Sequence, residues 1–93
     1  MTTPNRLTPA DIEAQVMFVD YHHFEETCVV VCCITLKNGY NTIGHAGCVD
    51  PENFDLEIGK KIAYENALNE IWQLEGYMLK EAMYQDALDK AGV

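Results

Sequence analysis

Basic residues are scarce in this sequence, and their scarcity limits what the protein can bind. Six Lys and Arg stand against 15 Asp and Glu in 93 residues, so the formal net charge is −9. Binding along a nucleic-acid backbone or to an anionic membrane surface relies on a basic surface. We therefore expect neither a nucleic-acid polymer nor a membrane as a partner. A small anion is still admissible, because a local pocket can be positive on an acidic protein.

Long apolar runs are also missing. The opening "MTTPNRLTPADIEAQ" contains no apolar core of a signal peptide, and no stretch has the length of a membrane span. The four cysteines, at positions 28, 32, 33 and 48, form no Cys-x-x-Cys pair. Cys32 and Cys33 cannot easily bridge, because neighbouring strand residues point to opposite faces. We expect an intracellular protein whose cysteines are free, reduced thiols.

Metal-ligating and catalytic side chains occur without a converging pattern. The metal candidates are His22, His23, His45 and Cys48, but a structural zinc site needs four converging ligands. Cys48 follows His45 by three residues, as in a thiol–imidazole pair, yet no third orienting group accompanies them. The many carboxylates show no specific acid–base pattern. We predict no metal site, no cofactor and no catalytic residue, and interpret Cys48 as a buried structural cysteine.

The patterns that are present predict a short helix followed by strands. After a loose lead over residues 1–7, Thr8 suits an N-cap and Pro9 the first helical position. "MFVDYHHFE" favours a strand through its aromatic and β-branched content, and "TCVVVCCITLK" is the clearest strand. Asn38-Gly39 indicates a type I′ hairpin turn, and "YNTIGHAGCV" is the return strand. Gly44 and Gly47 in that strand mark a bulge or a close approach to the backbone.

A helical pattern occupies the rest of the chain. "DPENFD" ends the sheet, where Asp50 can cap and Pro51 fits a first helical position. From Asp55 to about Lys90 apolar residues recur at helical spacing. The stripe consists of Ala63, Ala67, Ile71, Leu74, Met78 and Ala82, widened by Leu68, Trp72, Leu79 and Met83. We predict a single α+β domain over 1–93, with a short N-terminal helix, an antiparallel meander of about three strands and a long C-terminal helix, or two helices broken near Gly76.

The central strand is apolar on both of its alternating faces. Cys28, Val30, Cys32, Ile34 and Leu36 form one set, and Val29, Val31 and Cys33 form the other. Such a strand is covered on both sides, here by a helix and by something else. In so short a chain the second cover can be another protomer. We predict a homo-oligomer at micromolar concentration.

The adjacent lysines Lys60 and Lys61 lie near the start of the long helical pattern. They can be solvated residues paired with acids at helical spacing. Alternatively, they can add charge to the free amides of a helix N-terminus and form an anion pocket. Nearby aromatic residues favour a nucleotide, with its base stacked and its phosphate paired. These aromatic residues are Tyr40, Phe54 and Tyr64.

Several ordered motifs resemble those of one family. They are "LTPADIEA" at 7–14, "NG" at 38–39, "CVDPENFD" at 48–55, "IGKKIA" at 58–63 and "IWQLEGY" at 71–77. This set is similar to a family of small phage and prophage proteins that includes the first-described Thoeris anti-defence proteins. The resemblance implies a sponge in the cytoplasm of the infected bacterial host. Such a sponge binds a cyclic ADP-ribose isomer made by TIR enzymes, or a cyclic oligonucleotide, without cleaving it. It also implies a pocket shared between protomers.

We choose the expected ligand contacts by their side-chain chemistry, from the part of the chain that resembles the family. The candidates are Lys60, Lys61, Phe54, Tyr64, Asn53, Tyr40 and Lys80. We expect arginine at phosphate contacts, but this segment has lysine. A lysine ammonium is a single point charge, whereas an arginine guanidinium can form two parallel hydrogen bonds to a phosphate. A second hypothesis is an acidic phage adaptor or inhibitor that binds a host protein and no small ligand. The acidic balance favours this adaptor, whereas the clustered lysines and aromatic residues favour the sponge. An enzyme acting on nucleotides ranks third.

Overall fold

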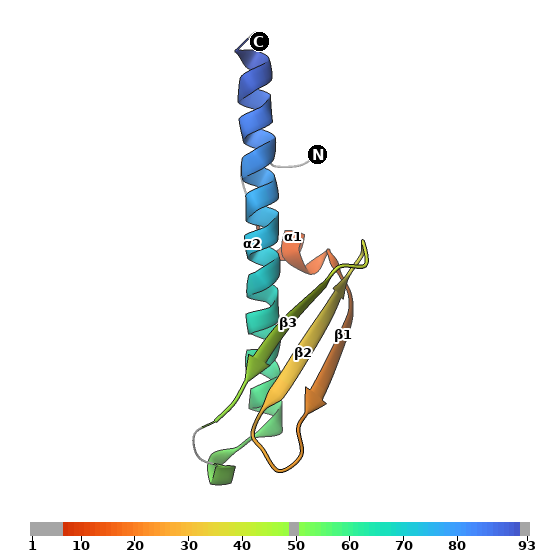
Figure 1. Ribbon diagram of the computed structural model, residues 1–93, viewed down its shortest axis with the longest axis vertical. Coiled ribbons are helices and arrows are strands. Elements are labelled where there is room, and N and C mark those ends of the chain that lie inside the picture. The colour runs from red at the N-terminus through yellow and green to blue at the C-terminus, as the bar shows by residue number, and fades with distance from the viewer. Residues whose placement is uncertain (1–6, 49–50, 92–93) are drawn as a thin grey trace.

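The protein consists of a small antiparallel sheet packed on one end of a long helix. The computed structural model describes residues 7–48 and 51–91. The elements are α1 (Pro9–Glu13), β1 (Val16–His23), β2 (Val30–Leu36), β3 (Asn41–Ala46), the 3-10 helix η1 (Pro51–Asn53) and α2 (Leu56–Lys90). Figure 1 shows the sheet beside the first half of α2, while the second half extends past it. The α+β prediction is confirmed, and α2 runs without a break through Gly76.

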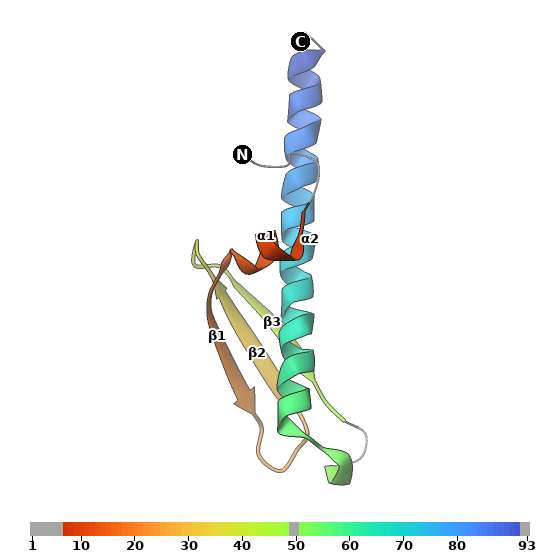
Figure 2. The same ribbon diagram turned by 180° about the vertical axis from the view of Figure 1, so that it is seen from behind.

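Helix α1 is held by the cap that the sequence predicts. The Thr8 hydroxyl accepts a hydrogen bond from the Asp11 backbone N–H at 3.3 Å, and the Asp11 carboxylate accepts one from the Thr8 N–H at 2.9 Å. This reciprocal capping box satisfies two otherwise unpaired amides. Ile12 then points inward and is buried against the core. Figure 2 shows α1 lying across the middle of α2. Apart from Leu7, the predicted loose lead lies outside the described residues.

The hairpin between β2 and β3 lies where Asn38-Gly39 predicts it, but its turn differs from the predicted type. A type I′ turn needs positive φ at two residues, and within this turn only Gly39 has one, at 91°. The Leu36 N–H donates to the Tyr40 carbonyl at 2.8 Å, which makes a three-residue loop. The Asn38 side chain accepts from the Tyr40 N–H at 3.0 Å, and this bond holds Asn38 with negative φ. The prediction of a type I′ turn is therefore wrong, and Gly39 is the only residue of this turn with positive φ.

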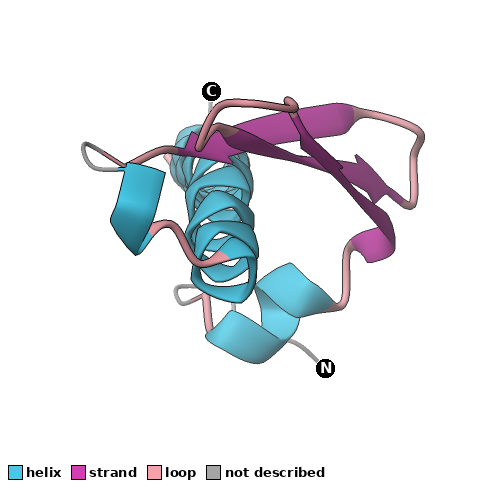
Figure 3. Cartoon of the chain, turned by 90° about the horizontal axis from the view of Figure 1, so that it is seen from below, coloured by secondary structure: helices cyan, strands magenta, loops and turns pink. Residues whose placement is uncertain are grey.

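The core lies between one face of the sheet and the first half of α2. The strand order is β1-β2-β3, all antiparallel. The buried residues on β2 are Val30, Cys32, Ile34 and Leu36, and those on α2 are Gly59, Ala63, Ala67 and Ile71. Small residues dominate the helix side, so α2 lies very close to β2 and β3, as the end view in Figure 3 shows. The apolar stripe predicted for this helix is thus buried only as far as Ile71.

Gly44 marks the closest approach between the sheet and α2. A Cβ atom built on Gly44 would collide with the backbone nitrogen of Ala67 and the backbone carbonyl of Ala63. The sequence predicts either a bulge or a close approach at this glycine, and the structure shows the close approach. The regular register of β2 and β3 continues through the position, with Cys32 opposite Gly44.

Thr42 is the one buried polar residue of this core, within the part of the chain that the structure describes. Its side chain is 4% exposed, and its hydroxyl has no hydrogen-bond partner among the described residues. We expect Thr42→Val to raise the free energy of unfolding by about 1 kcal/mol, because it removes an unsatisfied hydroxyl without changing the volume. Urea denaturation measures this change. The matched control is Thr35→Val, whose hydroxyl donates to the Asn41 side chain at 2.8 Å and whose loss should not stabilise. A destabilised Thr42→Val variant would contradict the assignment.

Candidate functional site

A lysine on α2 lies against an aromatic ring on β1. The Lys60 ammonium is 5.5 Å from the centroid of the Tyr21 ring, within the range of a cation–π contact. The Lys60 ammonium also lies 3.9 Å from the Glu57 carboxylate, one turn earlier on the helix. Glu57 is 83% exposed, so this ion pair is weak and easily displaced. Lys60 is therefore a half-buried cation positioned by a ring, with one weakly held counter-ion.

A second aromatic pair lies next to this contact. The rings of His23 and Phe54 are stacked, with centroids 4.9 Å apart and planes inclined by 21°. His23 follows Tyr21 by two residues on β1, so both side chains point to the same face of the sheet. Phe54 reaches that face from the connection between η1 and α2. The two pairs consequently occupy neighbouring positions along β1.

Tyr64 completes what we call the lysine–aromatic cluster, defined as Tyr21, His23, Phe54, Lys60 and Tyr64. Tyr64 follows Lys60 by four residues, so it lies on the same face of α2. Burial raises the pKa of Tyr64, with smaller contributions from Glu13 and Cys32. Burial also raises the pKa of Tyr21, with smaller contributions from Cys32, Tyr64 and Glu57. Both phenols therefore stay protonated at neutral pH and can donate hydrogen bonds.

A pocket of about 140 Å³ shares Phe54 with the cluster and lies between the end of β3 and the start of α2. Asn53 and Phe54 line it, together with Ile58 and Ile62 of α2. Whole small-molecule sites usually measure about 300–1,000 Å³. This pocket can therefore hold a ring or a ribose but not an entire dinucleotide. Phe54 connects the two features, because it also stacks on His23.

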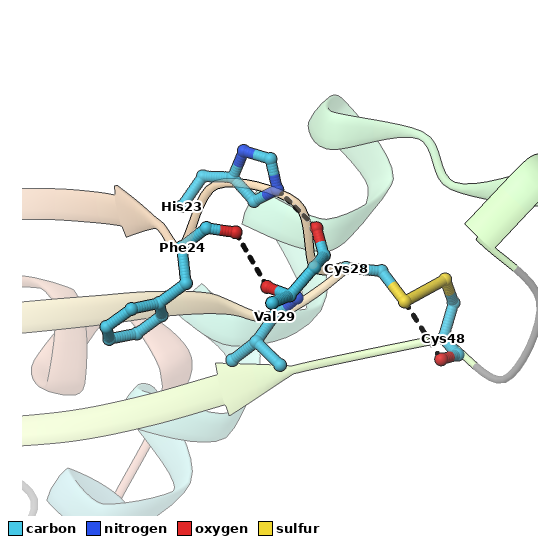
Figure 4. Close-up of a disulfide and its surroundings, with 6 residues drawn as sticks. His23, Phe24, Cys28, Val29 and Cys48 are labelled. Carbon is cyan, nitrogen blue, oxygen red and sulfur yellow. Dashed lines mark hydrogen bonds between the residues drawn. A yellow bond between two sulfur atoms is a disulfide. The ribbon is translucent and has the colours of Figure 1, made fainter.

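A disulfide between Cys28 and Cys48 forms one wall of this pocket. The bond links the segment before β2 to the segment after β3, with Cα atoms 5.6 Å apart (Figure 4). The expectation that all four cysteines are free is therefore wrong, and only Cys32 and Cys33 are free thiols. The sequence separation of 20 residues hides the pairing, since the β2–β3 hairpin brings the two ends together. The Cys28 sulfur also lies 2.9 Å from the Cys48 carbonyl, a contact that becomes a hydrogen bond only after reduction.

The N-terminus of α2 is not a free anion site. The Asp55 carboxylate accepts hydrogen bonds from the backbone N–H groups of Glu57 at 2.9 Å and Ile58 at 3.4 Å. A carboxylate thus already occupies the position that a phosphate would take. The idea that free amides reinforce the lysine charge is wrong for this helix. Asp50, also considered as a cap, lies outside the described residues.

The other predicted ligand residues lie apart from the cluster. Lys61 follows Lys60 in sequence but is exposed on a different side of α2. Tyr40 is at the hairpin turn, where it lines a separate pocket of about 250 Å³ with Leu74 and Met78. Lys80 is exposed 20 residues beyond Lys60, about 30 Å along the helix. The structure thus brings together Lys60, Phe54 and Tyr64, with Asn53 at the adjoining pocket.

Comparison with known families connects the chain to phages. The sequence model of the phage protein (N4 Gp49/phage Sf6 gene 66) family matches residues 7–83, well over half of the chain. The chain belongs to this family. No curated protein and no solved structure gives a significant match. The match covers every residue of the lysine–aromatic cluster, so the cluster lies within the phage family domain.

Sequence reasoning does not single out Tyr21 as a ligand residue of this phage protein, and it considers His23 only for a metal. The alternation in "DYHHF" does place Tyr21 and His23 on one face of a strand. It cannot show that this face turns toward Lys60, because the direction depends on how β1 pairs with β2. Tyr21 lies opposite Cys32, a buried residue that faces α2, and this register decides the orientation.

The described residues of the phage protein supply no metal cluster and no membrane-crossing helix. No group of three or more His, Cys, Asp or Glu side chains lies close enough to hold a metal ion within residues 7–48 and 51–91. The helices described there are too polar or too short to span a bilayer. Cys48 is in the disulfide, so it forms no thiol–imidazole pair with His45. Burial raises the pKa of Cys32 to about 11, with a smaller effect of Cys33, which keeps this thiol protonated.

Proposed function

We propose that this phage protein binds and sequesters a cyclic nucleotide immune signal, of the cyclic ADP-ribose type made by TIR enzymes, without cleaving it. The observation that supports this function most is the position of Lys60 over the Tyr21 ring, with Tyr64 one turn further along α2. A nucleotide needs a cation for its phosphate and flat rings for its base. The lysine–aromatic cluster offers both within a few residues of β1 and α2.

The lysine, the two phenols and Phe54 have different chemical roles in this proposal. The Lys60 ammonium pairs with a phosphate oxygen, which competes with the exposed Glu57 for the lysine. Tyr21 or Tyr64 stacks on the base, and a protonated phenol donates a hydrogen bond to ribose or phosphate. The neighbouring pocket accepts a ring against Phe54. A lysine gives a single point charge, so it tolerates several phosphate geometries and favours a class of cyclic nucleotides over one isomer.

The proposal includes association with a second copy of the chain and action in the cytoplasm of the infected bacterium. The pocket at Phe54 holds only about 140 Å³, less than a dinucleotide fills. A second protomer would enclose the remainder of the ligand. We assign no catalytic residue, since sequestration needs tight binding and no bond breaking.

Lys60→Ala should weaken binding of a cyclic ADP-ribose isomer about ten- to a hundredfold. A charge-assisted contact to phosphate contributes roughly 1.5–3 kcal/mol, and about 1.4 kcal/mol corresponds to tenfold. The measurement is calorimetric titration of the wild type and the variant, followed by chromatography of the recovered ligand, which should be intact. The matched control is Lys61→Ala, because it removes the same charge from the next residue, outside the cluster.

Three results of this titration would count against the cluster or the function. If Lys61→Ala or Lys80→Ala weakens binding while Lys60→Ala does not, the ligand lies elsewhere on α2. If the ligand is recovered in a cleaved form, the protein is an enzyme and the sponge assignment is wrong. If the wild type binds none of the cyclic nucleotides tested, the adaptor function takes precedence.

The adaptor function has its own structural support. The second half of α2 extends past the sheet and exposes apolar side chains, namely Tyr77 at 70%, Met78 at 61% and Tyr84 at 56%. Such a projecting, partly apolar helix suits a groove on a host protein. Binding of a host protein that survives in Lys60→Ala but not in Tyr84→Asp would favour this alternative.

A further inference from the structure

A second pocket lies at the opposite end of the sheet, between the β2–β3 hairpin and α2. Its volume is about 250 Å³, and its helix wall begins just beyond Ile71, the last buried residue of α2. The lining residues are Leu36, Asn38 and Tyr40 of the hairpin and Leu74, Glu75 and Met78 of the helix. Glu75 follows Lys60 by 15 residues, about 22 Å along α2. This hairpin pocket is therefore separate from the proposed nucleotide site.

Glu75 is the one charged residue that lines the hairpin pocket. It is half-buried, whereas every other acid of α2 is exposed. Its neighbours one turn before and one turn after on the helix are all apolar, namely Ile71, Trp72, Met78 and Leu79. The ion pairs of the described residues do not involve Glu75, and neither do their hydrogen bonds. A carboxylate held in apolar surroundings without a cation is costly, so this position favours a bound positive charge.

Tyr40 adds an aromatic ring to the same wall. The Asn38 side chain accepts a hydrogen bond from the Tyr40 N–H at 3.0 Å, which fixes the backbone of the turn at this residue. Tyr40 is 57% exposed and lines the pocket from the hairpin, opposite the helix. An aromatic ring attracts organic cations through its negative face, and a nearby carboxylate adds to that attraction.

The wall chemistry excludes several classes of ligand. An anion or a nucleotide is disfavoured, because no Lys, Arg or His lines the pocket and Glu75 repels a phosphate; Lys37 lies in the same hairpin but is not a lining residue. A calcium ion needs six to eight oxygen ligands, which a single carboxylate does not supply. A purely apolar molecule would leave the charge of Glu75 without a partner. An organic cation with a hydrocarbon part satisfies both the carboxylate and the apolar wall.

We propose that the hairpin pocket binds a small organic cation, which is a primary ammonium or guanidinium group on a short hydrocarbon chain. The cation pairs with Glu75 beside the Tyr40 ring, and the chain packs against Leu36, Leu74 and Met78. The volume of about 250 Å³ is just below the usual range for small-molecule sites, which limits the ligand to a few carbons. The net charge of −9 raises the concentration of cations near the surface. This site does not depend on nucleotide binding.

The test uses probes that share a hexyl chain and differ in charge. Hexylamine, hexanol and hexanoate are each titrated into the wild type, and nitrogen–proton NMR spectra report the chemical-shift change of every backbone amide. We expect hexylamine to bind with a Kd on the order of 1 mM, hexanol about tenfold more weakly and hexanoate not measurably. The shifts should concentrate in residues 36–40 and 74–78. Raising NaCl from about 0.05 to about 0.5 M should weaken hexylamine but not hexanol, because salt screens only the charged contact.

Substitutions in the wall separate the charge from the ring. Glu75→Gln should weaken hexylamine about tenfold and leave hexanol unchanged, so that the two probes bind equally. The matched control is Glu70→Gln, which removes the same charge from an exposed position of the same helix outside the pocket and should bind hexylamine as the wild type does. Tyr40→Phe keeps the ring and should retain binding, whereas Tyr40→Leu should weaken hexylamine about threefold. The dispersion of the NMR spectra verifies that each variant is folded.

Several outcomes overturn the proposal. One is a wild type that does not bind hexylamine, or that binds hexanol equally well, because the pocket then does not recognise a cation. Another is an equal loss in Glu75→Gln and Glu70→Gln, which would assign the effect to the overall charge of the protein. Shifts that fall outside the hairpin and residues 74–78 would place the ligand elsewhere. Lys60→Ala should bind hexylamine as the wild type does, so this proposal and the nucleotide site can fail separately.

Discussion

Gly44→Ala is expected to lower the free energy of unfolding by at least about 3 kcal/mol, or to prevent folding. The new Cβ would meet the backbone of Ala63 and Ala67, which cannot turn away as a flexible side chain can. To accommodate it, α2 must move off the sheet, and the buried contacts of Cys32 and Ile71 loosen. A small domain has a total stability on the order of 5–15 kcal/mol, so the loss is a large fraction of it. Urea denaturation followed by circular dichroism measures the effect.

Two other glycines are matched controls for this substitution. At Gly47, three residues further along the chain, an added Cβ would make only ordinary contacts, the nearest at 3.9 Å from the Cys28 carbonyl. At Gly76, in the middle of α2, it would have no neighbour within 4 Å. Gly47→Ala should therefore be nearly neutral, and Gly76→Ala should stabilise the helix by about 0.5–1 kcal/mol. If Gly44→Ala is as stable as Gly47→Ala, α2 does not pack on β3 as described.

Removal of the disulfide should have the second largest effect. Replacing Cys28 and Cys48 together by serine is expected to lower the free energy of unfolding by about 3 kcal/mol, since the bond closes a loop of 20 residues. The bond also joins the two ends of the hairpin next to Phe54 and the pocket. We therefore expect the double variant to bind the nucleotide more weakly than its stability alone explains. Denaturation with and without a thiol reductant gives the same comparison on the wild type.

The control for the disulfide is Cys33→Ser. Cys33 is a free thiol on the side of the sheet that faces away from α2, so its replacement should leave the free energy of unfolding nearly unchanged. Alkylation of the denatured, unreduced protein followed by mass spectrometry counts the free thiols directly. Two modified cysteines support the pairing, and four would restore the interpretation of fully reduced thiols. In that case the double serine variant should lose little stability.

Local signals in the sequence determined the elements of this protein. Thr8 and Pro9 fixed the start of α1, and the Asn38-Gly39 pair fixed the position of the hairpin. Capping, turn formation and helical periodicity all act within a few residues. A short stretch of sequence is therefore enough to predict them. The same locality explains why Lys60, Phe54 and Tyr64 could be chosen together, since they lie within eleven residues of one another.

Contacts between distant residues were decided only by the tertiary structure. The register of β1 on β2 turned Tyr21 and His23 toward Lys60, and the hairpin closed the distance between Cys28 and Cys48. Both depend on pairing between segments that are far apart in the chain, and no local pattern in the sequence specifies such pairing. Which half of α2 is buried depended likewise on the length of the sheet, because three short strands cover a 35-residue helix only as far as Ile71. The sequence determined by itself that α2 has an apolar stripe, while packing determined where that stripe is covered and where it is left exposed.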